Sequence, residues 1–170
     1  MQQDELYATV LSTFGAALER LARSYEADDD KRRDLLQEIH FALWRSLSTY
    51  AERCSLRTWV YRVAQNVAAS HVVKGRRARP EFVGLDDVGD LPTSGDETGR
   101  LDRQITLDRI YGLIRTLTTL DRDVILLYLE GFDAASIAEI TGLAATNVHT
   151  KIHRIKKLLK QLTKGESHGA

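Results

Sequence analysis

Residues 132–162 read FDAASIAEITGLAATNVHTKIHRIKKLLKQL, and this stretch decides the fold. Apolar residues recur every three or four positions on both sides of the short turn Gly142-Leu143-Ala144, which is the spacing of amphipathic helices. Two helices joined by a short glycine-containing turn are typical of a helix-turn-helix. We predict that the second helix runs from Ala145 to Leu162. The residues expected to pack between the two helices are Ile137, Ile140, Leu143, Val148, Ile152, Ile155 and Leu159.

The opposite face of this second helix carries polar groups that suit the major groove of DNA. Arginine can form two hydrogen bonds with guanine, asparagine can pair with adenine, and lysine and threonine can hold phosphates. A recognition helix presents mainly its N-terminal residues to the bases. A solvated basic face is the simpler alternative, but the complete helix, turn and helix favour DNA reading. The predicted contact residues are Thr146, Asn147, His149, Thr150, Lys151, His153 and Arg154.

Helical spacing also dominates the remainder of the chain. Apolar stripes that begin near Leu6, Leu35 and Trp59 predict three helices in the N-terminal half. Trp59 keeps helical spacing with Val63 and Val67, so we expect it in the core rather than on a DNA-binding surface. No stretch alternates apolar and polar residues as a half-buried strand does. The predicted fold class is therefore all-α.

The distribution of charge divides the chain into two small helical domains. Residues 81–104 carry seven Asp/Glu against two Lys/Arg, whereas residues 141–165 carry six Lys/Arg and no acid. Both prolines and four of the eleven glycines lie between residues 80 and 99, which is the composition of a flexible linker. We predict a first domain at 1–79, a flexible acidic linker at 80–104, a helix-turn-helix domain at 105–164 and a frayed tail at 165–170.

The composition argues against several classes of protein. The net charge is zero, and no apolar run approaches the about 18 residues that span a membrane, so we expect a cytoplasmic protein without membrane insertion. The single cysteine, Cys54, excludes an internal disulfide. The five histidines show no metal-ligand spacing and no nucleophile is activated by a recognisable motif. We therefore expect no metal, no other cofactor and no enzymatic activity.

The N-terminal half carries a resemblance to a known family. Asp34-Leu35-Leu36-Gln37-Glu38 opens a helix, and Leu43-Trp44-Arg45 follows. After a polar loop comes the run from Leu56 to Asn66, which leads into Gly75-Arg76-Arg77. This succession resembles region 2 of bacterial RNA polymerase sigma factors of the extracytoplasmic-function (ECF) group.

The C-terminal half resembles region 4 of the same family. The segment from Leu117 to Val124, the run from Ile137 to Ile140, and Val148 with Arg154 fall in the family's order and spacing. The resemblance implies a two-domain subunit that binds the clamp and flap of RNA polymerase core. Region 2 would open the −10 promoter element and region 4 would read the −35 element. It also implies an anti-sigma factor as a further candidate partner.

Region 2 supplies the candidates for −10 contact. The resemblance places Asn66 at a position implicated in this contact, and the loop from Tyr50 to Leu56 leads into an aromatic-rich helix. Strand opening needs a pocket for an unstacked base and a basic surface for the exposed strand. A solvated helix end is the alternative for the cations. The predicted residues are Tyr50, Arg62, Asn66, Lys74, Arg76 and Arg77.

The helix that begins near Asp34 supplies the candidates for polymerase binding. Phe41 lies off the stripe formed by Leu35, Ile39 and Leu43, so it is either exposed for a partner or buried against another helix. The residues that the resemblance assigns to the polymerase are Asp34, Leu36, Gln37, Glu38, Phe41 and Arg45.

One segment departs from the family pattern. Family members usually carry acids just before the position of Asp34, but here Lys31-Arg32-Arg33 stands there and the acids are displaced to 28–30. Three cations would weaken docking to a basic clamp surface. Phosphorylation adds about −1.5 to −2 charges at a site. We therefore take Ser48 and Thr49, in the nearby polar loop, as candidate phosphorylation sites, with a Ser/Thr kinase as a candidate partner.

Two other functional classes compete with a sigma factor. A stand-alone helix-turn-helix regulator would use residues 1–77 to sense a ligand or to dimerise, and it would bind an operator without polymerase. The third hypothesis is a pure interaction protein with a decayed helix-turn-helix. The intact basic face of residues 145–162 argues against it.

Overall fold

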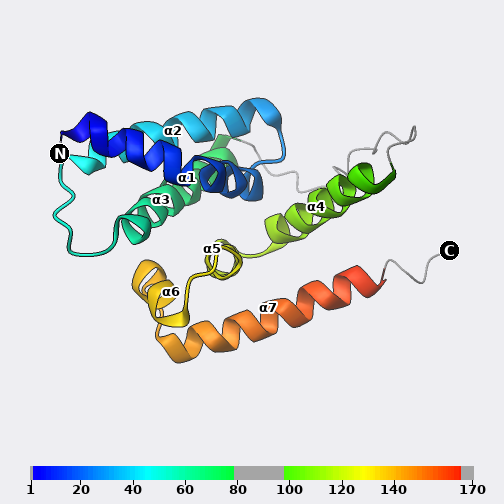
Figure 1. Ribbon diagram of the computed structural model, residues 1–170. Helices are drawn as coiled ribbons and strands as arrows, with labels where there is room; N and C mark the ends of the chain where they lie inside the picture. Colours follow the sequence, from blue (N-terminus) through cyan, green and yellow to red (C-terminus); the bar gives the residue numbers. More distant parts are fainter. Residues whose placement is uncertain (1, 79–97, 166–170) are drawn as a thin grey trace.

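The computed structural model describes residues 2–78 and 98–165, and within these ranges it contains helices and no strands, as predicted (Figure 1). Three helices form the N-terminal module and four form the C-terminal module. The helices are α1 (Gln3–Tyr25), α2 (Asp29–Leu47), α3 (Leu56–Ala78), α4 (Thr98–Thr116), α5 (Thr119–Leu129), α6 (Ala134–Thr141) and α7 (Ala145–Gly165).

The helices α1, α2 and α3 bury the apolar stripes that the sequence predicts. Leu18 of α1, Leu35 and Ile39 of α2, and Val60 of α3 are fully buried. The sharp turn between α1 and α2 is stabilised by Asp28, whose carboxylate accepts hydrogen bonds of 3.0 Å from the backbone amides at positions 30 and 31. Such a cap satisfies amides that have no partner within the helix and is worth about 1 kcal/mol.

The C-terminal module packs α5, α6 and α7 around a second apolar centre. Val124, Ile137, Val148 and Ile155 are buried there, and the predicted helix-turn-helix is present as α6 and α7. The turn depends on Gly142, whose φ of 79° lies in the left-handed region. Side chains with a Cβ rarely adopt this conformation, so glycine ends α6 and lets α7 set off in a new direction.

The helix boundaries differ from the predicted linker at one place. Residues 98–104, which the acidic composition assigned to the linker, form the first turns of α4. Their charged residues are exposed on a helix, and composition alone does not separate an exposed helical end from a linker. The remainder of the predicted linker, residues 80–97, lies outside the described residues, as does the tail after Gly165.

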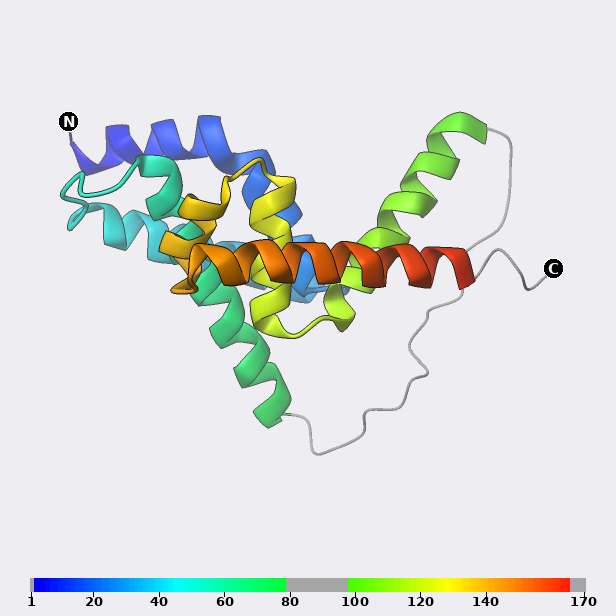
Figure 2. The same cartoon turned by 90° about the horizontal axis from the view of Figure 1, so that it is seen from below.

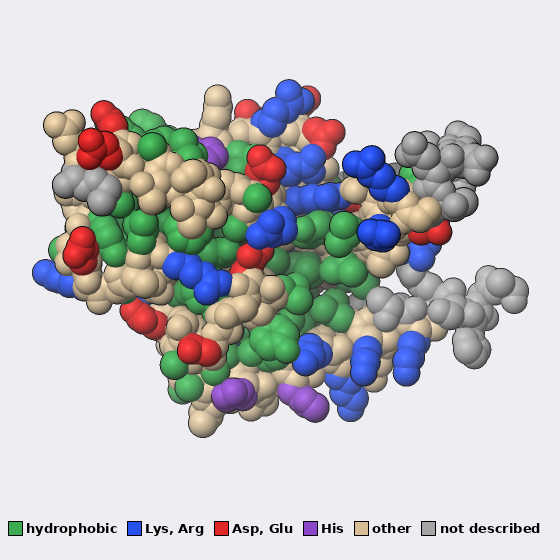
Figure 3. All heavy atoms as spheres, in the orientation of Figure 1, with side chains coloured by type: hydrophobic (Ala, Val, Ile, Leu, Met, Phe, Trp, Pro, Cys, Tyr) green, Lys and Arg blue, Asp and Glu red, His purple; other side chains and the backbone are tan. Residues whose placement is uncertain are grey.

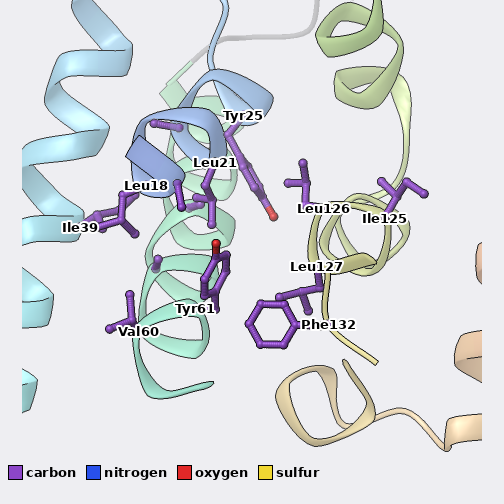
Figure 4. Packing of buried hydrophobic residues seen from close by; sticks show 14 of the residues in the cluster. Leu18, Leu21, Tyr25, Ile39, Val60, Tyr61, Ile125, Leu126, Leu127 and Phe132 are labelled. Carbon is purple, nitrogen blue, oxygen red and sulfur yellow. The ribbon is translucent and has the colours of Figure 1, made fainter. Parts of the chain in front are cut away.

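The two modules pack against each other. Helices α1 and α3 face α4, α5 and α6, and α7 crosses the outer side of the C-terminal module (Figure 2). Aromatic side chains meet at this junction: the rings of Tyr61 and Phe132 lie 4.9 Å apart and nearly perpendicular, and both residues are buried. Leu126 and Tyr25 flank them (Figure 4). The buried cluster therefore runs without a break from one module to the other.

A buried arginine closes the C-terminal end of α4. Arg122 is only 4% exposed and donates hydrogen bonds to the carbonyl oxygens of Ile114, Arg115 and Leu117 at 3.3, 2.7 and 3.1 Å. The carbonyls of Ile114 and Arg115 lie in the last turn of α4, where the helix supplies no amide four residues farther on. The guanidinium also lies over the ring of Tyr25, 4.8 Å from its centre. Arg122 thus fixes the turn between α4 and α5 and contacts α1 across the junction.

An acidic group is buried at the same junction. Tyr25 of α1 donates a hydrogen bond from its hydroxyl to Asp123 of α5, and Gln65 of α3 donates one to the Asp123 carbonyl oxygen at 3.3 Å. Burial raises the pKa of Asp123 to about 6, although the hydrogen bond from Tyr25 and the charge of Arg122 oppose that rise. The ionised carboxylate that prevails at neutral pH therefore destabilises the closed packing of the two modules.

We predict that Asp123→Asn changes how stability depends on pH. The folded pKa of Asp123 exceeds the unfolded value of about 4, so its protonation stabilises the fold fully below about pH 4. This contribution is lost as the pH rises through about 6, the folded pKa. We expect Asp123→Asn to be more stable than the natural chain at pH 7 by about 1–2 kcal/mol, with the difference vanishing near pH 4. Urea unfolding between pH 4 and 7 measures this, and an equal difference at both ends would contradict it.

Candidate DNA and polymerase interfaces

The predicted DNA-reading residues lie on one outward face of α7. Thr146, Asn147, His149, Thr150 and His153 are all exposed, while Val148 and Ile155 of the same helix turn inward and are buried. Figure 3 shows histidine, lysine and arginine side chains along the outer edge of the molecule, where α7 lies. The helix has the length and the polar face that entry into a major groove requires.

Two cations of the predicted set are held in place by α5. The carboxylate of Asp121, 15% exposed, lies 2.7 Å from Nζ of Lys151 and 3.3 Å from Nη2 of Arg154. Lys151 is half-buried in this pair, so it orients α7 more than it presents a charge to DNA. Arg154 is 64% exposed and its contact with Asp121 is longer. Arg154 is therefore the cation of this set that is best placed to exchange its carboxylate for a base edge.

The N-terminus of α7 adds a binding feature that comes from the backbone. The sequence places Ala144 before the helix, and alanine has no side-chain acceptor for the first amides. The first intrahelical hydrogen bond runs from the Val148 amide to the Ala144 carbonyl oxygen at 3.0 Å, so the amides of residues 145–147 have no partner within the helix. Free amides at a helix N-terminus favour a phosphate group. The absence of a cap, which weakens the isolated helix, thus suits docking to the DNA backbone.

The predicted −10 residues are spread along α3 and the loop before it. Arg62 and Asn66 are one helical turn apart, whereas Lys74 and Arg76 are exposed two turns farther on. Asn66 is exposed, but Arg62 is half-buried because its Nη2 donates a hydrogen bond to the Glu139 carbonyl oxygen at 3.2 Å. The side chain of Arg77 lies outside the described residues. The C-terminal module therefore covers one of the predicted −10 residues.

The loop before α3 is organised by aromatic packing. Trp59 packs against the core, as predicted, and its Nε1 donates a hydrogen bond to Ser46 Oγ at 3.2 Å. The ring of Tyr50 lies 5.3 Å from that of Trp59, and the Tyr50 hydroxyl donates to the Cys54 carbonyl oxygen at 2.7 Å. Tyr50 is half-buried and is held against the loop rather than directed outward.

The predicted polymerase-binding residues form a stripe along the outer face of α2. Phe41 is 60% exposed, so of the two alternatives for this residue it is exposed rather than buried against another helix. Leu36 differs from the others because it is half-buried and packs against the core. The exposed members, spaced as neighbours on one helical face, are Asp34, Gln37, Glu38, Phe41 and Arg45.

The cations that depart from the family pattern are partly neutralised by the displaced acids. Arg33 pairs with Asp30 at 2.7 Å, and Arg32 pairs with Asp29 in the first turn of α2. Ser48 and Thr49 are exposed at the other end of the helix, and both hydroxyls donate to backbone carbonyls. The two ends are about 25 Å apart at 1.5 Å per residue, well beyond the Debye length of about 8 Å. A phosphate at these hydroxyls would act on the loop, not on the cations.

A carboxylate that the sequence analysis did not single out joins the two modules. Glu130, at the end of α5, receives two hydrogen bonds from Arg20 of α1, at 2.8 and 3.0 Å, and one from the Tyr61 hydroxyl of α3 at 3.1 Å. Arg57 of α3 donates to the Glu130 carbonyl oxygen, and its guanidinium lies 3.9 Å from the ring centre of Phe132. The neighbouring arginines hold the pKa of Glu130 below its usual value against the opposing effect of burial.

No local pattern in the sequence reveals this junction. Arg20 and Glu130 are 110 residues apart, and each stands on an otherwise ordinary amphipathic helix. The one indication is that Glu130 and Gly131 interrupt the apolar run that ends at Leu129 and resumes at Phe132.

Two family models match the chain, one over each module. The model described as Sigma-70 region 2 matches residues 11–78, and the model described as Sigma-70, region 4 matches residues 107–159. The matches stand in the predicted order and leave the segment between the modules uncovered. The second match contains the helix-turn-helix and all predicted DNA-reading residues of α7.

Full-length relatives support the same assignment. The chain is 26% identical over 169 residues to the RNA polymerase sigma factor CnrH of Cupriavidus metallidurans, covering 95% of this chain and 88% of the relative. It is 25% identical over 164 residues to the ECF sigma factor SigX of Bacillus subtilis, covering 93% and 84%. The two regions thus occur together in proteins of nearly the same extent.

Solved structures share the arrangement of helices. The sigma factor RpoE of Bartonella quintana, solved with the anti-sigma factor NepR, aligns with a TM-score of 0.73 at 22% identity, covering 93% of this chain and 96% of that one. CnrH, solved with the cytosolic domain of CnrY, aligns with a TM-score of 0.68 at 20% identity, covering 95% and 90%. Within the described residues, no helix combines the length and apolar character that crossing a bilayer requires. Two matched regions in one chain, with full-length relatives of the same kind, show that the protein belongs to the ECF group of RNA polymerase sigma factors, which direct transcription initiation at promoters.

Proposed function

We propose that this sigma factor uses the outer face of α2 to bind polymerase, the exposed part of α3 to engage the −10 element, and the outer face of α7 to read the −35 element. The polar face of α7 carries this assignment, because most of its residues are exposed, and Arg154 stays 64% exposed although it pairs with Asp121. The protein acts as an initiation factor rather than an enzyme, in the cytoplasm where polymerase and chromosome meet. Run-off transcription with purified core polymerase, with and without the chain, tests the whole assignment.

We further propose that the closed packing of the two modules is a resting state. Arg62 of α3 touches Glu139 of α6, and Thr146 follows seven residues later, so the two DNA-contacting surfaces lie within about 30 Å of each other. The −10 and −35 elements are centred about 25 base pairs apart, which corresponds to about 85 Å of B-DNA. The closed form cannot engage both elements of an undistorted promoter. Initiation therefore requires the modules to separate.

The covalent connection permits such a separation. Nineteen residues lie between Ala78 and Thr98, a contour length of about 65 Å. Each module has its own buried centre, so opening exposes the junction and leaves both folds intact. The solved relatives CnrH and RpoE were each captured with an inhibitory or partner protein. We propose that an anti-sigma factor biases the same equilibrium in this chain, whereas phosphorylation at Ser48 or Thr49 would act locally, on the loop before α3.

A stand-alone regulator is the function that these proposals must exclude. Such a protein binds its operator without polymerase, and its closed form is able to bind DNA. A sigma factor binds promoter DNA well only together with core polymerase. Tight promoter binding by the purified chain, without stimulation of run-off transcription, would favour the regulator.

We predict that Phe41→Ala weakens binding to core polymerase at least tenfold. Exposed aromatic side chains are frequent anchors of protein interfaces, and Phe41 has little packing within its own module. The stability of the free chain should change by less than about 0.5 kcal/mol. Leu11→Ala, at another exposed apolar residue on α1, is the matched control. If the two variants bind core polymerase with equal affinity, Phe41 is not part of the polymerase interface.

We predict that Arg154→Ala relaxes promoter specificity. Loss of a base contact by arginine costs about 1–3 kcal/mol and acts at one base pair. Transcription by the reconstituted holoenzyme from a promoter library mutated around −35 measures both the loss and its position. Lys157→Ala, an exposed lysine farther along α7, should weaken transcription uniformly across the library. A uniform effect of Arg154→Ala would show that this residue contacts phosphate rather than a base.

We predict that Glu130→Ala shifts the free chain toward the open form. The loss of its charged hydrogen bonds costs the closed state about 2 kcal/mol, or about a 30-fold shift in population. Small-angle scattering should report a larger radius of gyration, and transcription at limiting core should rise. Glu130→Gln should have a smaller effect, and Asp30→Ala, at an exposed carboxylate of α2, none. An unchanged radius of gyration together with unchanged thermal stability would contradict the proposal that Glu130 holds the modules closed.

A further inference from the structure

A cavity lined by arginines lies where the two modules meet. It has a volume of about 790 Å³ and is bounded by α1, α2 and α4. Four arginines line it, Arg20 and Arg23 from α1, Arg32 from α2 and Arg115 from α4. Figure 3 shows lysine and arginine side chains gathered between α1 and α4. The volume lies within the range of about 300–1,000 Å³ that small-molecule sites occupy.

Arg115 is the least compensated charge in this cavity. It is half-buried, and within the described residues no carboxylate lies within 4.0 Å of its guanidinium. Its Nη1 donates instead to the Arg23 carbonyl oxygen at 2.7 Å. Burial lowers the pKa of Arg115, and the neighbouring arginines lower it further, while the charge of Asp108 opposes them. A guanidinium in such surroundings is stabilised when an anion enters, because the anion offsets both the desolvation and the repulsion.

The other arginines can exchange their present partners. Arg23 pairs with Asp108 of α4 and Arg32 pairs with Asp29, and both carboxylates are well exposed. Exposed ion pairs contribute little to stability, so a competing anion meets a small barrier. Arg23 also lies over the ring of Tyr111, 4.8 Å from its centre, which holds its guanidinium at the cavity wall. Arg20 remains engaged by Glu130 and is not counted among the ligand-binding groups.

We propose that this cavity binds a small molecule carrying two or more phosphate groups, held by Arg23, Arg32 and Arg115. The planar guanidinium matches two phosphate oxygens at once and is preferred where phosphate is recognised. More than one phosphate is needed because the cavity also contains the carboxylates of Asp29, Asp108 and Glu19, which repel a single weakly charged anion. The proposal also gives a role to Arg32, one of the three cations that replace the acids expected before Asp34.

Such a ligand would act on the same closed state as Glu130. Arg23 and Arg32 belong to the N-terminal module and Arg115 to the C-terminal module. A molecule bound by all three is bound only while the modules are packed together, so it shifts the population toward the closed form. The site would couple the activity of the sigma factor to the concentration of a phosphorylated metabolite.

Isothermal titration of the full chain with inorganic pyrophosphate, inorganic triphosphate and ATP tests the site. Ionic strength is matched with sodium chloride, and sodium sulfate is titrated as the control anion. We expect saturable binding with one site per chain, and at least a tenfold loss of affinity in Arg115→Gln and in Arg32→Gln. Arg33→Gln is the matched control, because Arg33 neighbours Arg32 on α2 but does not line the cavity. If Arg115→Gln fails to fold by circular dichroism, Arg32→Gln against Arg33→Gln decides the question.

Three outcomes would overturn the proposal. The first is the absence of binding by all three phosphorylated probes. The second is an equal affinity for sulfate and pyrophosphate, which would indicate a general response to anions. The third is an equal loss in Arg32→Gln and Arg33→Gln, which would indicate the overall charge of α2. These readouts require neither polymerase nor promoter, so they succeed or fail separately from the proposed role in initiation.

Discussion

The side chain of Glu130 is the contact on which the closed form of this protein depends. Its carboxylate receives hydrogen bonds from two helices of the N-terminal module, through Arg20 of α1 and Tyr61 of α3. The backbone of the same residue accepts a hydrogen bond from Arg57. These bonds bring Tyr61 against Phe132 and so bury the aromatic contact between the modules. In partly desolvated surroundings, charged hydrogen bonds are stronger than in water, and their loss is correspondingly more costly.

The chemical character of the junction differs from that of the two module centres. Each centre is filled by aliphatic side chains such as Leu35 and Ile155, whereas the junction combines aromatic rings with buried or half-buried charges. Asp123 and Arg122 are examples, and burial destabilises the charged form of each. Such a mixed interface is typical of domains that associate reversibly within one chain. It suits the proposed change between a closed state, with the two predicted DNA-binding surfaces close together, and an open state.

The sequence predicts the parts of this structure that arise from local periodicity. The apolar stripes locate the helices and Trp59 in the core, and the glycine turn locates the helix-turn-helix. They do not predict the pairing of Asp121 with Lys151 and Arg154, since those contacts join residues 30 or more positions apart. Composition likewise misplaces the start of α4, because exposed charged residues occur both in linkers and at solvated helix ends. Local sequence patterns do not predict the junction around Glu130 either, because Arg20 and Glu130 are 110 residues apart in the sequence.

The hydrogen bonds of Arg122 support the proposal that the modules separate without unfolding. All three of its carbonyl partners lie in α4 or in the turn that follows, inside its own module. Across the junction its guanidinium lies over the ring of Tyr25, a contact that is weaker than a buried hydrogen bond to a charged group. Opening therefore exposes one face of Arg122 and leaves the connection between α4 and α5 capped. The same division holds for α7, because Asp121 ties Lys151 and Arg154 to α5 of the same module. In the proposed opening, the predicted DNA-contacting face of α7 therefore keeps its geometry, and only its distance from the N-terminal module changes.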